Sequence, residues 1–311
     1  MKRVPMRDGY GKALLELCRL HEDVVVLDAD VAKSTRTDWV RREYPDKYVN
    51  VGISEQDLVG TAAGMSLTGF VPFISTYGVF LTGRAWGQIR NTICYNNLNV
   101  KLGGAHAGIS VGPDGATHQA LEDVALMRVI PNMTLIVPCD WHETYKATLA
   151  VYDMKGPSYV RFGRNPAPVV TTEDTPFIVG KAAVFRDGSD VTIFANGIMV
   201  YQALQAADIL QQEGISAEII NVHTVKPLDT QTIVASVGKT KAVVVCEEHQ
   251  CIGGLGSAVC EALAQHCCVP VELVGIQDTF GESGMPDELL EAYGLDASSI
   301  VQAVRNVLKR K

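Results

Sequence analysis

The chain has 311 residues, of which 47% are hydrophobic, 20% charged and 7% aromatic, so it is long enough for two globular domains and is not disordered in composition. Its net charge of -8 and pI near 5.4 argue against nucleic acid or an acidic membrane as the main partner, because either would favour a basic face. No apolar stretch approaches the roughly 18 to 20 residues that cross a bilayer. The basic N-terminus lacks the apolar core of a signal peptide, so we expect a cytoplasmic protein.

The first half alternates helical patterns with short β-branched runs, in the order α then β, which predicts a parallel sheet. The expected helices cover residues 12–20, 55–67, 80–94, 120–129 and 142–151. The expected strands are VVVLDAD (24–30), FVPFIST (70–76), NVKLGGA (99–105), TLIVP (134–138) and SYVRF (158–162).

A stretch rich in Pro and Thr, NPAPVVTTEDTPF (165–177), separates the halves and reads as a linker. The alternation then restarts. Strands are expected at 191–197, 217–222, 241–249 and 271–276, and helices at 200–212, 230–237, 255–266 and 298–308. The sequence therefore predicts two doubly wound α/β domains with mainly parallel sheets, at 1–170 and 185–311, joined by a linker at 171–184.

The eight cysteines are scattered without a CxxC pair, and several lie in apolar runs, where a reduced, buried thiol is the usual state. We expect no metal ligation by them. They are Cys18, Cys94, Cys139, Cys246, Cys251, Cys260, Cys267 and Cys268.

Glu55 is the first residue of chemical interest. Ser54 and Asp57 have the spacing of a capping box, which places Glu55 in the first turn of a helix, at a sheet edge where ligands commonly bind. On spacing alone, a carboxylate that complements the helix dipole is the better explanation.

A glycine-rich loop, residues 103–119, carries His106, Asp114 and His118. Glycine costs conformational entropy, so such a loop usually needs unusual backbone angles or close approach to a ligand. Histidines there can bind metal, move protons or donate hydrogen bonds. The sequence supplies no further metal ligands, which favours an organic substrate and no metal site.

The stretch 76–86 contains Tyr77 and Phe80, either of which can stack on a flat heterocycle. Core packing is the ordinary explanation for Phe80. Its combination with Glu55 and the glycine-rich loop favours stacking.

Five segments together resemble the transketolase family of thiamine-diphosphate enzymes, over essentially the whole chain. The G-x-D-G-x-T-H-Q run in the third segment is the most specific match. The segments are GISEQDLVG, YGVFL, HAGISVGPDGATHQ, SYVRFGRNPAP and VVVCEEHQCIGGLGSAV. They correspond to the family's pyrimidine-binding and C-terminal domains.

The resemblance implies a cofactor role for three residues. Glu55 is similar to the glutamate that hydrogen-bonds N1′ of the aminopyrimidine, where a shielded carboxyl shares a proton with a ring nitrogen. Phe80, with Tyr77 beside it, matches the aromatic segment that contacts the pyrimidine. Thiamine diphosphate itself supplies the carbanion chemistry.

The resemblance also implies substrate contacts. His106, Asp114 and His118 match positions that touch the sugar's carbonyl and hydroxyls, with His118 as the proton carrier. Arg164 matches an arginine that binds the substrate phosphate, and Arg7 aligns with a second one, for which a bidentate guanidinium is suited.

Two departures bear on the substrate. Asp28 stands where many transketolases have a serine that assists the phosphate, so either Asp28 points away or the anionic group differs. Gly83 replaces an aromatic of many full-length members, and Trp86 is expected to compensate. A standard C5 or C6 sugar phosphate is not assured.

The Gly-Asp-Gly motif that marks the family's diphosphate-binding domain is absent from the sequence. The resemblance therefore implies a separate N-terminal subunit that holds the diphosphate through a divalent metal, Mg or Ca, in an α2β2 assembly. Together the subunits would be a transketolase that moves a two-carbon ketol unit from a ketose, expected to be phosphorylated, to an aldose.

Three other functions remain open. The β subunit of a 2-oxoacid dehydrogenase E1 component uses the same glutamate but lacks the G-x-D-G-x-T-H-Q loop. A deoxyxylulose-phosphate synthase shares the loop but is usually one longer chain. A non-catalytic regulatory or binding subunit is disfavoured by the joint presence of Glu55, Phe80, His106, Asp114 and His118.

The glycine cluster 253–256 after the run KAVVVCEEH suggests a dinucleotide site, but Val259 stands where GxGxxG needs its third glycine. Tight packing between strand and helix is the better explanation. His249 is expected to be an interface or structural residue.

Overall fold

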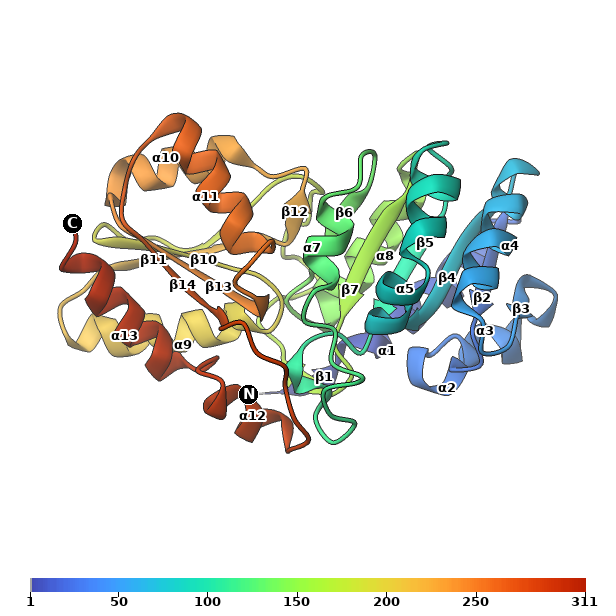
Figure 1. The fold of residues 1–311 in the computed structure, drawn as a ribbon, viewed down its shortest axis with the longest axis horizontal. Helices are drawn as coiled ribbons and strands as arrows, with labels where there is room; N and C mark the ends of the chain where they lie inside the picture. Colours follow the sequence, from blue (N-terminus) through green and yellow to red (C-terminus); the bar gives the residue numbers. More distant parts are fainter. Residues whose placement is uncertain (1) are drawn as a thin grey trace.

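The computed structural model describes residues 2–311 and has two lobes, each with a sheet between layers of helices (Figure 1). The first lobe is built on a seven-stranded sheet in the order β12-β6-β7-β5-β4-β2-β3, parallel throughout except for β12. Its strands are β2 (Val24–Asp28), β3 (Tyr48–Asn50), β4 (Val71–Tyr77), β5 (Lys101–Ala105), β6 (Thr134–Ile136), β7 (Ser158–Phe162) and β12 (Thr224–Lys226).

Helices cover both faces of this sheet, which is why its central strands are apolar at successive positions. In β2, Val24 and Val26 pack with α1 and α8, while Val25 and Leu27 face the opposite cluster with α4 and α5. The helices are α1 (Met6–Leu20), α2 (Ala32–Thr35), α3 (Asp38–Glu43), α4 (Glu55–Leu67), α5 (Gly78–Arg84), α6 (Trp86–Gln88), α7 (Asp123–Arg128) and α8 (Trp141–Asp153), with short 3-10 turns at Pro45–Lys47 and Ile109–Val111.

The second lobe has a five-stranded sheet in the order β14-β13-β10-β11-β9, in which β9 alone is antiparallel. Helices α9 and α13 lie on one face, and α10 and α11 on the other (Figure 1). The elements are β9 (Ala183–Arg186), β10 (Val191–Ala195), α9 (Met199–Gln212), β11 (Ala217–Asn221), α10 (Thr230–Thr240), β13 (Val243–Gln250), α11 (Leu255–His266), β14 (Val271–Ile276), α12 (Pro286–Ala292) and α13 (Ala297–Leu308). The predicted α/β class with mainly parallel sheets is confirmed.

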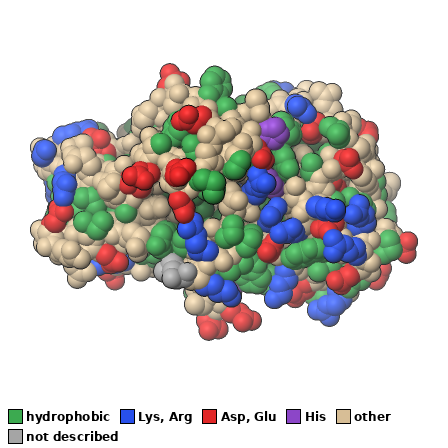
Figure 2. All heavy atoms as spheres, turned by 90° about the horizontal axis from the view of Figure 1, so that it is seen from below, with side chains coloured by type: hydrophobic (Ala, Val, Ile, Leu, Met, Phe, Trp, Pro, Cys, Tyr) green, Lys and Arg blue, Asp and Glu red, His purple; other side chains and the backbone are tan. Residues whose placement is uncertain are grey.

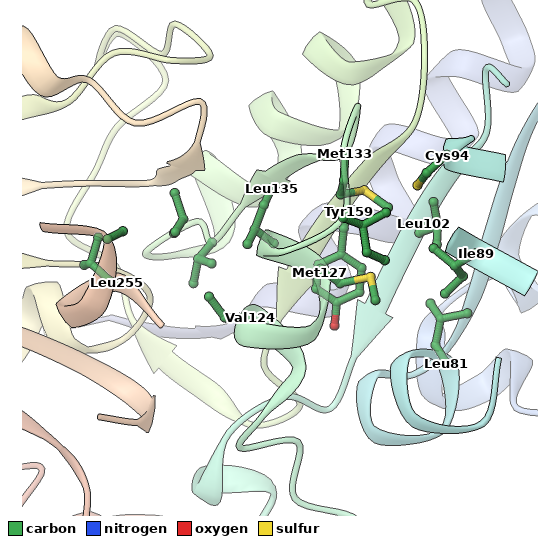
Figure 3. Close-up of a cluster of buried hydrophobic side chains, with 14 of the residues drawn as sticks. Leu81, Ile89, Cys94, Leu102, Val124, Met127, Met133, Leu135, Tyr159 and Leu255 are labelled. Carbon is green, nitrogen blue, oxygen red and sulfur yellow. The ribbon is translucent and has the colours of Figure 1, made fainter. Parts of the chain in front are cut away.

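The two lobes share structure. Strand β12 follows the second lobe's β11 in the chain but pairs with β6 of the first sheet. One hydrophobic cluster continues across the boundary, because Leu255 of α11 belongs to the same cluster as Val124 and Leu135 of the first lobe (Figure 3). Within the stretch that the sequence marks as a linker, β8 (Pro166–Pro168) pairs with β1 (Arg3–Pro5). The lobes are therefore joined through β-pairing and a common core.

The single helix expected at 80–94 is wrong. The chain forms α5, leaves helical angles at Ala85, and resumes as α6 and a π-helical turn at Ile89–Cys94. Gly83 and Gly87 flank the break and lower helix propensity there. None of the helices within residues 2–311 is long and apolar enough to cross a membrane.

Candidate active site

The residues singled out in the sequence gather at one edge of the first sheet. Tyr77 ends β4, His106 follows β5 directly, and Arg164 lies two residues after β7. Because these strands are parallel neighbours, their carboxyl ends meet at the same edge, where ligands bind in open α/β sheets. Glu55 reaches this edge from the start of α4, after β3.

Glu55 is buried, with 6% of its surface exposed, although it opens a helix. The capping box expected at this helix is wrong. The Ser54 side chain makes no capping hydrogen bond, because its backbone is turned by a bond from its own N–H to the carbonyl of Gly52 (2.8 Å). The Glu55 carboxylate instead accepts hydrogen bonds from Arg84, at 3.3 and 3.4 Å.

The aromatic segment and the glycine-rich loop meet beside Glu55. Tyr77 stacks on His106 with ring centroids 4.2 Å apart, and Phe80 meets His118 edge-on at 5.2 Å. The Tyr77 and Phe80 rings are 5.8 Å apart. The arrangement forms an aromatic wall next to a shielded carboxylate.

His106 is held in an unusual state. Its φ of 56° lies in the left-handed region that non-glycine residues rarely adopt, its surface is 1% exposed, and its Nδ1 has no hydrogen-bond partner among the described residues. Burial, and after it the charges of Arg7, Arg164 and Arg36, lower its pKa to about 3. His106 is therefore neutral near pH 7, and one of its ring nitrogens is buried without a hydrogen-bond partner among the described residues.

The low pKa of His106 predicts a loss of stability in mild acid. In the unfolded chain the histidine has a pKa of about 6.5 and binds a proton below that pH, whereas His106 in the folded chain binds one only near pH 3. Between pH 7 and 5 this lowers the free energy of unfolding by about 2 kcal/mol. A His106→Gln variant should lose that much of its pH dependence in urea unfolding. Burial lowers the pKa of His223 to about 4, so His223 should cause a further loss of stability in acid that remains in the variant. A pH dependence that is unchanged in His106→Gln would contradict the lowered pKa of His106.

Three arginines, Arg7, Arg36 and Arg164, form what we call the arginine cluster beside His106. Arg164 pairs with Asp114 at 2.9 Å and Arg36 with Asp8 at 2.6 Å. Figure 2 shows Lys and Arg side chains gathered near histidines on this face of the molecule.

Among residues 2–311, no carboxylate forms an ion pair with Arg7. It donates to the carbonyl of Ser34 at 3.1 Å, and its buried Nε has no partner among the described residues. Burial, and then the charge of Arg36, lower its pKa. The arginine cluster therefore has unsatisfied capacity to bind an anion.

Sequence reasoning missed Arg36 and Ser34, which no motif spacing marks. Both lie on the segment 31–37, and Ser34 also accepts a hydrogen bond from Tyr77 Oη at 3.0 Å. Their place in the site depends on how this segment folds back over α1, with Arg36 at a φ of 70°.

Asp28 fixes the conformation of the segment 31–37 through hydrogen bonds. Its carboxylate accepts hydrogen bonds from the backbone N–H of Val31 (2.6 Å) and the hydroxyls of Thr35 (3.0 Å) and Thr37 (2.9 Å). Burial raises its pKa, and these three bonds oppose the rise. Both carboxylate oxygens are thus used within the turn, and Asp28 does not oppose an anion at the arginine cluster.

The expectation that Trp86 compensates for Gly83 is wrong. Trp86 donates from Nε1 to the carbonyl of Leu126 at 3.0 Å and packs against the hydrophobic core. Gly83 has open space where a side chain would begin. Position 83 is therefore left without an aromatic side chain.

The second lobe supports the glycine-rich loop. The Glu248 carboxylate accepts from the backbone N–H of Ser110 at 2.6 Å, and a Cβ at Gly108 would collide with that carboxyl group. Gln119 donates to the carbonyls of Ile109 and Glu282, which closes the loop onto the second lobe. The second lobe therefore sets the shape of the loop that carries His106, Asp114 and His118.

The glycine cluster 253–256 serves packing. The Glu247 carboxylate accepts from the backbone N–H of Leu255 (2.7 Å) and Gly256 (2.8 Å), and so fills the N-terminus of α11 where a dinucleotide phosphate would bind. His249 is fully buried and its Nε2 accepts from the N–H of Ala125 at 3.3 Å, which makes it a structural link between the lobes.

Comparison with known proteins identifies the class to which this fold and site belong. Residues 2–169 match "Transketolase, pyrimidine binding domain" and residues 180–300 match "Transketolase, C-terminal domain". The chain belongs to the transketolase family.

Its relatives include chains of the same length. It is 44% identical to a putative transketolase C-terminal section of Methanocaldococcus jannaschii, covering 98% of this chain and 97% of that one. It is 41% identical to the 6-deoxy-6-sulfo-D-fructose transketolase subunit SqwH of Clostridium sp., covering 98% and 95%. A solved structure described as a split gene transketolase, inactive beta4 tetramer, superimposes with a TM-score of 0.93 at 47% identity and 99% coverage of both chains.

A pyrimidine-binding domain of this family implies thiamine diphosphate as the cofactor. The residues present fit its aminopyrimidine end, because a buried carboxylate and an aromatic ring, Glu55 and Phe80, are already bridged by one planar N–H donor, Arg84. Within residues 2–311, no group of three or more His, Cys, Asp or Glu side chains is placed to hold a metal ion.

Proposed function

We propose that this chain is the pyrimidine-binding subunit of a two-chain transketolase, which transfers a two-carbon ketol unit from a ketose to an aldose. The observation that carries the proposal is the meeting, at one sheet edge, of a shielded carboxylate with an aromatic wall, a histidine loop and the arginine cluster. An N-terminal partner subunit would hold the diphosphate through Mg or Ca in an α2β2 assembly. A cytoplasmic location stays a prediction from the sequence.

Each side chain then has a distinct task. Glu55 hydrogen-bonds N1′ of the aminopyrimidine, and Phe80 and Tyr77 line the space for its ring. The cofactor supplies the carbanion chemistry when bound. Glu55 holds the proton at the ring nitrogen, in surroundings where low dielectric strengthens the bond.

The substrate lies over the glycine-rich loop. Neutral His106 offers Nδ1 to a hydroxyl or the carbonyl, and Asp114 accepts from a sugar hydroxyl. His118, partly exposed at the mouth, moves the proton of the sugar hydroxyl.

The anionic end of the substrate is bound by the arginine cluster. Asp8 and Asp114 each neutralise one of its guanidinium groups, which leaves Arg7 to bind a phosphate or a sulfonate. The relative from Clostridium sp., named for a sulfonated ketose, supports including sulfonates among the candidates.

Reconstitution tests this function. The chain is combined with a partner subunit that carries the Gly-Asp-Gly motif, plus thiamine diphosphate and Mg²⁺. Transfer of a ¹³C-labelled two-carbon unit is then followed from fructose 6-phosphate, 6-deoxy-6-sulfo-D-fructose or fructose. We expect transfer only with both chains, with at least one anionic donor preferred over fructose by at least about tenfold, since a charged hydrogen bond contributes about 1.5 to 3 kcal/mol. Decarboxylation of a 2-oxoacid without ketol transfer would overturn the proposal.

A further inference from the structure

Arg84, at the end of α5, contacts both groups assigned to the cofactor's aminopyrimidine. Its guanidinium donates to both oxygens of Glu55 at 3.3 and 3.4 Å, and its Cζ lies 4.2 Å from the centre of the Phe80 ring. Within residues 2–311, it is the only hydrogen-bond donor to the Glu55 carboxylate. One side chain therefore spans the carboxylate and the aromatic face.

A guanidinium and an aminopyrimidine offer the same two surfaces to a protein. Each is planar, each presents N–H or ring nitrogen to a carboxylate in its own plane, and each stacks on an aromatic face. Arg84 already occupies the position between Glu55 and Phe80, so a second planar group that made both contacts would have to displace it.

We propose that the Arg84 side chain is an internal stand-in for the aminopyrimidine. In the free subunit it occupies the aminopyrimidine's position, and it must move away before the cofactor binds. The proposal rests on the proposed function, because it takes Glu55 and Phe80 as the cofactor's contacts. Arg84 is thus a positioning residue, which acts through Glu55 by keeping a buried carboxylate paired until a ring nitrogen replaces the guanidinium.

The surroundings of Arg84 allow this exchange. Its side chain is 55% exposed, so its outer end has water to move into. Its backbone is fixed separately, because its carbonyl accepts a hydrogen bond from Gln56 Nε2 at 3.0 Å. Helix α5 ends at Arg84, because the chain leaves helical angles at the next residue, Ala85.

The contacts that Arg84 makes with Glu55 and Phe80 oppose cofactor binding only weakly. A partly exposed ion pair and an exposed cation–π contact are both weak, so their loss on cofactor binding should weaken pyrimidine binding by about tenfold. Without Arg84, Glu55 is a buried carboxyl group with no partner beside it, so it gains more from sharing a proton with the ring nitrogen of the probe.

Binding of the aminopyrimidine alone to the free, full-length chain tests the proposal. The probe is 4-amino-5-hydroxymethyl-2-methylpyrimidine, and its dissociation constant is measured by calorimetry and ligand-observed NMR. We expect R84A to bind the probe about tenfold more tightly than the unaltered chain, with R84K between them because lysine keeps the charge but lacks the planar fork. R90A, which removes an exposed arginine six residues further on, should leave the affinity unchanged.

An R84A affinity equal to or below that of the unaltered chain, including no detectable binding by either, would overturn the stand-in role. In particular, weaker binding by R84A would show that Arg84 is itself a cofactor ligand. These outcomes leave the transketolase function standing, because that function is tested by ketol transfer in the assembled enzyme and by variants at Glu55.

Discussion

Replacing Glu55 with glutamine is expected to lower kcat for ketol transfer in the assembled enzyme by about a thousandfold. Glutamine keeps the size and much of the hydrogen bonding of the side chain but cannot share a proton with a ring nitrogen. A positioned acid or base contributes about 10² to 10⁴ in rate, and a thousandfold loss is the middle of that range. Steady-state kinetics of the two-chain enzyme measure the effect.

Two comparisons separate chemistry from folding in that experiment. Proton exchange at the thiazolium C2 of bound cofactor, followed by NMR, should slow in Glu55→Gln even without substrate. Asp57→Asn changes an exposed carboxylate two residues along the same helix and should behave as the unaltered enzyme. Near-normal transfer by Glu55→Gln would remove Glu55 from the catalytic role.

The second large effect is expected from the buried ion pair between Asp123 and Arg161. Arg161 Nε donates to the Asp123 carboxylate at 2.9 and 3.1 Å, and Tyr159 Oη donates to the same group at 2.8 Å. Burial lowers the pKa of Arg161, but the charges of Asp123 and Glu248 more than offset this and raise it overall. Asp123→Leu strands a buried cation and should lower the free energy of unfolding by about 3 to 5 kcal/mol, measured by urea unfolding.

A double variant distinguishes loss of the pair from loss of packing. Asp123→Leu with Arg161→Met replaces both charges by apolar groups and should be markedly more stable than Asp123→Leu alone. Asp208→Ala removes an exposed partner of Arg186 and should change the free energy of unfolding by about 1 kcal/mol or less. If the double variant is no more stable than Asp123→Leu, the unpaired charge of Arg161 is not the cause of the lost stability.

The ion pair between Asp123 and Arg161 also helps to hold the glycine-rich loop. Arg161 also donates to the carbonyls of Ala120 and Glu248, at 3.0 and 2.9 Å, and so ties the end of the glycine-rich loop to β13 of the second lobe. The network therefore supports the same loop that Glu248 holds through Ser110.

Much of the fold could be predicted because its elements are encoded by local patterns. The helices at 55–67 and 255–266 were predicted with the bounds of α4 and α11. In both, apolar residues recur at helical spacing, and a serine or a glycine stands directly before the first helical residue. Among the elements that were not predicted, β8, β9 and β12 are short strands whose pairing partners lie far away in the chain. Without the partner, such a segment has no periodicity to distinguish it from a loop.

The same division applies to the candidate site. The motif residues Glu55, Phe80, His106 and His118 were found because each stands in a recognisable run, and the parallel sheet brings those runs to one edge. Arg84 stands in one of those runs, yet its sequence context says nothing of the contact that it makes with Glu55.

By itself, the sequence determined the class of fold, the family resemblance and the residues with chemical potential, because periodicity and motif spacing are local properties. The tertiary structure alone decided that Asp28 turns into its own segment, that Arg36 joins Arg7 and Arg164, and that Arg84 bridges Glu55 and Phe80. These arrangements depend on burial and on contacts between distant segments, whose energies exist only once the sheet has brought the segments together.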